Sequence, residues 1–121
     1  MQSITIITEQ GQSPEIDYPK PERLLEGNPR RQTWSGYDSP DGVLAAGIWC
    51  CETGAWRIAF SPEKEEFFCV MSGRVRLSNM MGEHWEVGPS EAAVIPAGFN
   101  GVFQVLEPVR KYYVIVERKT D

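Results

Sequence analysis

The stretch FSPEKEEFFCVMSG, residues 60–73, decides the fold of this 121-residue chain. A turn signal, Ser-Pro-Glu-Lys, leads into a run of strand character that ends at a glycine. Side chains alternate across a strand, so one face carries Glu66, Phe68 and Val70, and the opposite face carries Phe67, Cys69 and Met71. A strand that is apolar on both faces must be covered on both. We expect one face to line a barrel, and the N-terminal arm, a second sheet or another subunit to cover the other.

Similar short runs, apolar or alternating and bounded by turn residues, recur from Trp34 onward. They are GVLAAGIWCCE (42–52), AWRIAF (55–60), EFFCVMSG (66–73), RVRLS (74–78), HWEVG (84–88), AAVIPAG (92–98), GVFQVLE (101–107) and KYYVIVE (111–117). No stretch of this region shows a convincing helical period. Many short strands at close spacing predict an all-β sandwich or barrel.

The first third of the chain has a different composition. The segment SPEIDYPKPERLLEGNPRR (13–31) carries four prolines, which interrupt both ladders and helices. SITII (3–7) could form a short strand, and at most one helical turn fits around PERLLEG (21–27). We therefore predict an N-terminal arm packing on the core at residues 1–33 and a single β-barrel domain at residues 34–121.

The overall charge and the cysteines limit the possible partners and location. The net charge of −5 argues against nucleic acid, because a phosphate backbone requires a basic face. No apolar run approaches the roughly 20 residues of a membrane helix, so no membrane partner is expected. Three cysteines, two of them adjacent, do not form a secreted disulfide framework. With no recognisable signal peptide, we predict a cytoplasmic protein.

Two spaced motifs resemble those of the cupins, which are small jelly-roll barrels. The first has the spacing Gly54-x5-Phe60-x-Pro62-x3-Glu66-x6-Gly73, and the second has the spacing Ser90-x5-Pro96-x-Gly98-x2-Gly101-x3-Val105. The turn-forming glycines and proline of the family pattern are largely retained. The resemblance implies an all-β, single-domain cupin jelly-roll (RmlC-like) barrel.

The resemblance extends over most of the chain, from about Gly27 to Val116. The segments GNPRRQTW, GIWCCETGAWRI, EEFFCVMSGRVRL and VIPAGFNGVFQVLEPVRKYYVI resemble short bacterial cupins related to ureidoglycine aminohydrolase. This relationship implies a link to the catabolism of nitrogenous or other small metabolites.

The metal ligands of that family are replaced here. In metal-using members, three histidines and the motif glutamate hold a divalent ion such as manganese. The histidine positions are Phe60, Pro62 and Gly101 in this chain, and none of these side chains ligates a metal. We therefore predict no metal and no other cofactor. The single histidine, His84, is expected to point outward beside an inward-facing Trp85.

The motif positions also predict the contents of the lumen. With Glu66 inward, alternation gives an aromatic lumen with one carboxylate, which suits a small organic molecule better than an ion. The candidate ligand-binding residues are Glu66, Trp56, Phe60, Phe68, Phe103 and Tyr113. No catalytic residue is assigned. For the aromatic residues, simple core packing is an equally good interpretation.

Glu66 has two interpretations, because a carboxylate is rarely buried without a partner. It could form an ion pair or hydrogen bond inside the barrel, with Arg57, Lys111 or Tyr113. Alternatively, it could anchor a cationic or amide-bearing ligand.

Three functions follow from these observations. The first is a metal-independent cupin that binds a small molecule. The second is a ureidoglycine aminohydrolase-like enzyme acting on a ureide, with Glu66 as a metal-free acid or base. The third is a structural homodimer whose barrel is filled by side chains. A homodimer is expected in each case, since the apolar outer face of residues 66–73 and the proline-rich arm both need cover.

Overall fold

The computed structural model describes residues 2–120, which form nine strands and no helix. The strands are β1 (Glu15–Asp17), β2 (Leu24–Glu26), β3 (Arg31–Asp38), β4 (Leu44–Cys51), β5 (Gly54–Ala59), β6 (Lys64–Asn79), β7 (His84–Val87), β8 (Ala92–Ile95) and β9 (Asn100–Glu117). The all-β prediction is confirmed. This part of the chain contains no helix that could cross a membrane.

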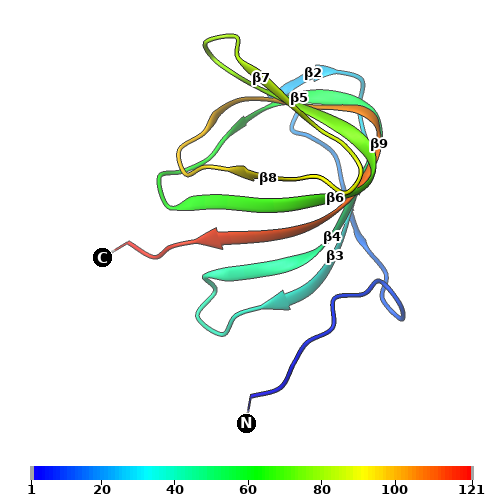
Figure 1. Ribbon diagram of the computed structural model, residues 1–121, viewed down its shortest axis with the longest axis vertical. Coiled ribbons are helices and arrows are strands. Elements are labelled where there is room, and N and C mark those ends of the chain that lie inside the picture. Colours follow the sequence, from blue (N-terminus) through cyan, green and yellow to red (C-terminus); the bar gives the residue numbers. More distant parts are fainter. Residues whose placement is uncertain (1, 121) are drawn as a thin grey trace.

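Two long strands, β6 and β9, connect the halves of one curled sheet (Figure 1). The first half of β6 pairs with β8 and with the second half of β9, which also pairs with β4. The second half of β6 pairs with β7 and with the first half of β9, which also pairs with β5. All these pairs are antiparallel. The two halves of the sheet therefore face each other and enclose a lumen.

The bend in β6 requires a glycine. Gly73 has a φ of +85°, and a Cβ atom at this position would lie 2.1 Å from the carbonyl oxygen of Pro108 on β9. The register between the two strands shifts three times between Val70 and Val75. The prediction of separate strands at 66–73 and 74–78 is thus wrong, because they form one bent strand. The runs at 101–107 and 111–117 likewise join through Pro108 into β9.

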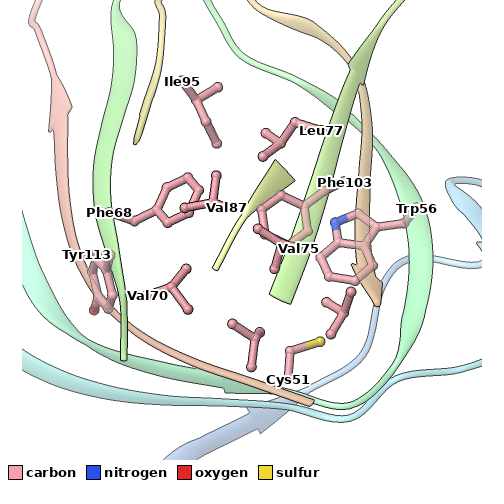
Figure 2. Packing of buried hydrophobic residues seen from close by; sticks show 12 residues of the cluster. Cys51, Trp56, Phe68, Val70, Val75, Leu77, Val87, Ile95, Phe103 and Tyr113 are labelled. Atoms are coloured by element: carbon pink, nitrogen blue, oxygen red, sulfur yellow. The ribbon is translucent and has the colours of Figure 1, made fainter. Parts of the chain in front are cut away.

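The core lies between the two halves of the sheet (Figure 2). Its buried members are Cys51, Trp56, Phe68, Val70, Val75, Leu77, Val87, Ile95, Phe103, Val105, Val109 and Tyr113. His84 is exposed, as expected. Trp85 lies on the inner face of the sheet, as expected, opposite the buried Leu77, but it is 49% exposed. Trp85 shares its parity with the buried Val87, but it lies nearer the tip of the β6–β7 hairpin and borders an open cavity.

The N-terminal region lies against both halves of the sheet. β1 pairs with β3 and β2 pairs with β5. The segment 3–7 is not a strand, which corrects that prediction, although Ile7 packs on Gly36 and Glu9 pairs with Arg110. Residue 1 of the predicted arm and residue 121 of the predicted barrel lie outside the described residues.

Candidate functional site

A cavity of about 340 Å³ opens between the two halves of the sheet. That volume lies at the lower end of the range for small-molecule sites. Its walls come from inward-facing positions of β3, β4, β5, β6 and β9, with contributions from β1, β8 and the residues after β5. The lining residues are Asp17, Arg31, Thr33, Ala45, Trp49, Trp56, Ile58, Phe60, Lys64, Glu66, Ile95, Phe103, Lys111, Tyr113 and Ile115.

A buried ion pair lies in this cavity. The Nζ atom of Lys111 on β9 donates to Oε2 of Glu66 on β6 at 2.8 Å. The two side chains are 5% and 10% exposed. Both residues face inward on adjacent strands, and the register pair Phe68–Tyr113 lies between them. Glu66 is therefore committed to a cation of the protein, and this identifies Lys111 among the partners considered from the sequence.

Aromatic rings surround the ammonium group of Lys111. Its Nζ atom is 4.4 Å from the ring centroid of Phe68, 4.5 Å from that of Trp49 and 5.0 Å from that of Phe103. Trp56 stacks on Phe103 with centroids 5.2 Å apart. A cation beside aromatic faces is attracted by the ring quadrupoles, and more strongly when water is excluded. The rings therefore make favourable contacts with the ammonium group inside the barrel.

Two further cations line the cavity. Arg31 donates from Nε and Nη2 to the two carboxylate oxygens of Asp17, at 2.9 and 2.7 Å, and its guanidinium carbon is 5.3 Å from the ring centroid of Trp56. The Nζ atom of Lys64 is 4.7 Å from the ring centroid of Phe60. The cavity therefore combines aromatic walls with charged groups of both signs.

Five of the six candidate ligand-binding residues line the cavity. They are Glu66, Trp56, Phe60, Phe103 and Tyr113. Phe68 is fully buried and does not belong to the lining, so its ring serves the core and Lys111. Burial raises the pKa of the Tyr113 hydroxyl, which remains a neutral hydrogen-bonding group at physiological pH.

Four of the charged and aromatic cavity residues were not identified from the sequence. They are Asp17, Arg31, Trp49 and Lys64. Lys64 could have been predicted, because it lies two positions before Glu66 on the same strand and therefore on the same face. Arg57, a possible partner of Glu66, is exposed and does not line the cavity.

The lumen does not fit the divalent metal of metal-using cupins. Phe60 and Pro62 offer no ligand atom at two of the three histidine positions, and at the third a Cβ atom on Gly101 would lie 1.9 Å from the carbonyl oxygen of Ser78. A histidine there would require β6 and β9 to move apart. The remaining motif carboxylate, Glu66, already holds an ammonium group that repels a cation. Within residues 2–120, no three His, Cys, Asp or Glu side chains are grouped to bind a metal.

Comparison with known families agrees with this architecture. A model of the EutQ-like cupin domain matches residues 38–113. The chain belongs to the EutQ-like cupin family. The jelly-roll prediction is thereby confirmed.

Individual relatives are distant from this EutQ-like cupin. Homogentisate 1,2-dioxygenase of Pseudomonas syringae pv. tomato is 27% identical over 72% of the chain, which spans 25% of that protein. A structure of unknown function from the same organism, of the DUF861 family, superposes with a TM-score of 0.77 at 19% identity, over 91% of this chain and 46% of that one. A candidate ethanolamine utilization protein Q from Salmonella typhimurium has a TM-score of 0.64 at 16% identity, over 90% of this chain and 100% of that one.

These comparisons establish the fold and the family. The chain spans only a quarter of the matched dioxygenase and under half of the first structural neighbour. The structural neighbours are below 20% identity and support the architecture alone.

Proposed function

We propose that this EutQ-like cupin binds a small organic molecule in its lumen without a metal ion. The observation that carries the proposal is the buried Glu66–Lys111 pair in an aromatic cavity of about 340 Å³. In this pair, an ammonium group bonds the motif glutamate that helps to hold the ion in metal-using cupins. The cavity is large enough for a small metabolite, and its polar groups are few and convergent, as in many ligand sites.

The functions named for two relatives support a role linked to small-metabolite catabolism. One relative is a dioxygenase named for homogentisate, and one structural neighbour is a candidate ethanolamine utilization protein. We infer a comparable setting for this chain, as a sensor or accessory protein of a catabolic pathway. A cytoplasmic location is consistent with its three free cysteines.

A ureidoglycine aminohydrolase-like enzyme is the second candidate. It would require Glu66 to act as an acid or base without a metal. In the resting protein, Oε2 of Glu66 already accepts a hydrogen bond from Lys111 at 2.8 Å. This arrangement supports binding better than proton transfer.

The third candidate is a homodimer with a filled barrel. The filled barrel and the dimerisation are considered separately. The cavity argues against a barrel that is merely filled. Dimerisation itself is supported by an apolar patch on the outer face of the sheet. There, Phe67 pairs in register with Val94, Cys69 pairs with Tyr112, and Phe67, Val94 and Tyr112 are 47%, 60% and 43% exposed. We propose that a second copy of the chain covers this patch.

The test combines metal analysis with a ligand screen. After dialysis against a chelator, elemental analysis is expected to find no stoichiometric metal. A thermal-shift screen of ureides, amino acids, small amines, ethanolamine and homogentisate is expected to identify compounds that stabilise the protein, because a ligand that binds only the folded state raises the melting temperature.

Matched variants locate the binding. Ala45 lines the cavity, so Ala45→Phe should block the lumen and abolish the thermal shift. Ala59→Phe, at an exposed position, should retain it. One equivalent of retained transition metal, a complete absence of stabilising compounds, or an undiminished shift in the blocked variant would each contradict the proposal.

A further inference from the structure

We propose that the lumen selects an anionic ligand, a small carboxylate carried on a flat aromatic or other apolar body. This inference rests on the proposed binding function and specifies its ligand class. It reverses the sign expected from the sequence, where Glu66 was a possible anchor for a cationic or amide-bearing molecule. The reversal follows from the partner that Glu66 has in the structure.

The Glu66 carboxylate already has a cation of the protein as its partner. Its Oε2 atom accepts a hydrogen bond from Lys111, and both side chains are at least nine-tenths buried. A ligand ammonium group would have to displace Lys111 or lie beside it. Either arrangement places two cations close together where water screens them poorly, which is unfavourable.

The charges around the cavity favour an anion. Its lining contains three cations, Arg31, Lys64 and Lys111, and two carboxylates, Asp17 and Glu66, so its formal net charge is +1. The whole chain has a formal net charge of −5. A locally positive cavity with apolar walls on an acidic protein focuses the electrostatic field and raises the local concentration of anions.

Lys64 provides the anchor for the carboxylate. Among residues 2–120, no carboxylate oxygen lies within 4.0 Å of its Nζ atom, whereas Arg31 and Lys111 each have an acidic partner. Lys64 faces the lumen beside Phe60 at the start of β6. An ammonium group without a protein counter-ion at the wall of a cavity can satisfy its hydrogen bonds on a ligand carboxylate.

Arg31 offers a second donor. Its Nε and Nη2 atoms bond Asp17, and Nη2 also contacts the carbonyl oxygen of Tyr18, but Nη1 has no hydrogen-bond partner within the described part of the chain. The Arg31 side chain is 20% exposed and that of Asp17 is 61% exposed. The guanidinium therefore lies deeper in the protein than its carboxylate partner, and its remaining donor is available to an anion.

The walls define the rest of the ligand. Trp49, Trp56 and Phe103 form a contiguous aromatic cluster, with centroid distances from 5.2 to 6.2 Å. Flat rings offer a large apolar contact area to a flat ligand, and stacked or edge-on aromatic pairs are favourable. A single ring with a short carboxylate arm matches the volume of about 340 Å³ better than a larger molecule does.

Three probes of nearly equal size and different charge test the inference: phenylacetate, phenylacetamide and phenethylamine. Isothermal titration at low ionic strength is expected to give an affinity for phenylacetate about tenfold above that for phenylacetamide, because a hydrogen bond between charged groups is stronger than one to a neutral amide. Phenethylamine is expected not to bind. Added salt should weaken phenylacetate more than phenylacetamide.

Two variants test whether Lys64 binds the ligand carboxylate. Lys64→Met should weaken phenylacetate about tenfold and leave phenylacetamide unchanged, since only the charged contact is lost. Lys119→Met removes an exposed lysine that does not line the cavity and should change neither affinity.

The outcomes separate this inference from the binding function. Stronger binding of the amide or the amine would overturn the anionic preference while leaving small-molecule binding intact. An unchanged phenylacetate affinity in Lys64→Met would overturn the assigned anchor. If none of the probes binds, the inference fails, and a negative metabolite screen would then reject the binding function as well.

Discussion

Glu66→Gln tests the energetic role of the lumen ion pair. The substitution keeps the shape of the side chain and removes the counter-charge of Lys111, whose side chain is 5% exposed. Breaking a buried ion pair by removing one partner costs about 3–5 kcal/mol. Three aromatic rings within 5.0 Å of the Lys111 Nζ atom continue to stabilise the cation. We therefore expect the lower end of that range, about 3 kcal/mol of the free energy of unfolding.

The assay is urea unfolding followed by tryptophan fluorescence, supported by a thermal melt. For a chain of 121 residues, a loss of about 3 kcal/mol corresponds to a fall in melting temperature of roughly 10–15 °C. The matched control is Glu65→Gln on the same strand. Glu65 pairs with Arg118, and both side chains are partly exposed, so the cost should stay below about 1 kcal/mol.

A double substitution distinguishes a lost charge pair from a general packing defect. Glu66→Leu combined with Lys111→Met removes both charges and should lie within about 1 kcal/mol of the wild type, because apolar residues often replace a buried pair without loss. If Glu66→Gln costs no more than Glu65→Gln, the carboxylate does not stabilise Lys111 and the reasoning fails.

Three further predictions concern the bend, the outer face and the buried thiol. Gly73→Ala should cost roughly 3 kcal/mol or more in urea unfolding, because a Cβ atom would collide with Pro108 at a positive φ; an unchanged midpoint would contradict this. Light scattering should give twice the 13.7 kDa chain mass for the wild type and the monomer mass for Phe67→Glu, and a monomeric wild type would reject the dimer. Burial raises the pKa of Cys51 from 9.0 to about 12, so only the unfolded thiol loses its proton between these values. The free energy of unfolding should therefore fall as pH rises through this window, and Cys51→Ala should reduce that slope.

Some lumen residues could be predicted from the sequence, because alternation along one strand, starting from one motif residue, was enough to place them. Alternation from Glu66 placed Phe68 and Val70 inward, and both are fully buried. The same rule gave the face of Trp85 but not its burial, because parity fixes the direction of a side chain and not whether another element covers it.

The features missed by the sequence depend on pairing between distant segments. The single bent strand β6 follows from the contact of Gly73 with Pro108, which lie 35 positions apart in the printed sequence. The choice of Lys111 over the other partners of Glu66 depends on the register between β6 and β9. Arg31 and Asp17 reach the cavity because β1 pairs with β3. Non-local pairing of this kind leaves no local pattern in the sequence.

We propose that the lumen binds its ligand through protein charges and not through a metal. The most direct measurement is calorimetric titration of phenylacetate into protein that has been stripped with chelator and dialysed, repeated after addition of Mn²⁺. We predict binding in the stripped protein with a dissociation constant that Mn²⁺ leaves unchanged. Binding that is absent from the stripped protein and appears only with Mn²⁺ would contradict it.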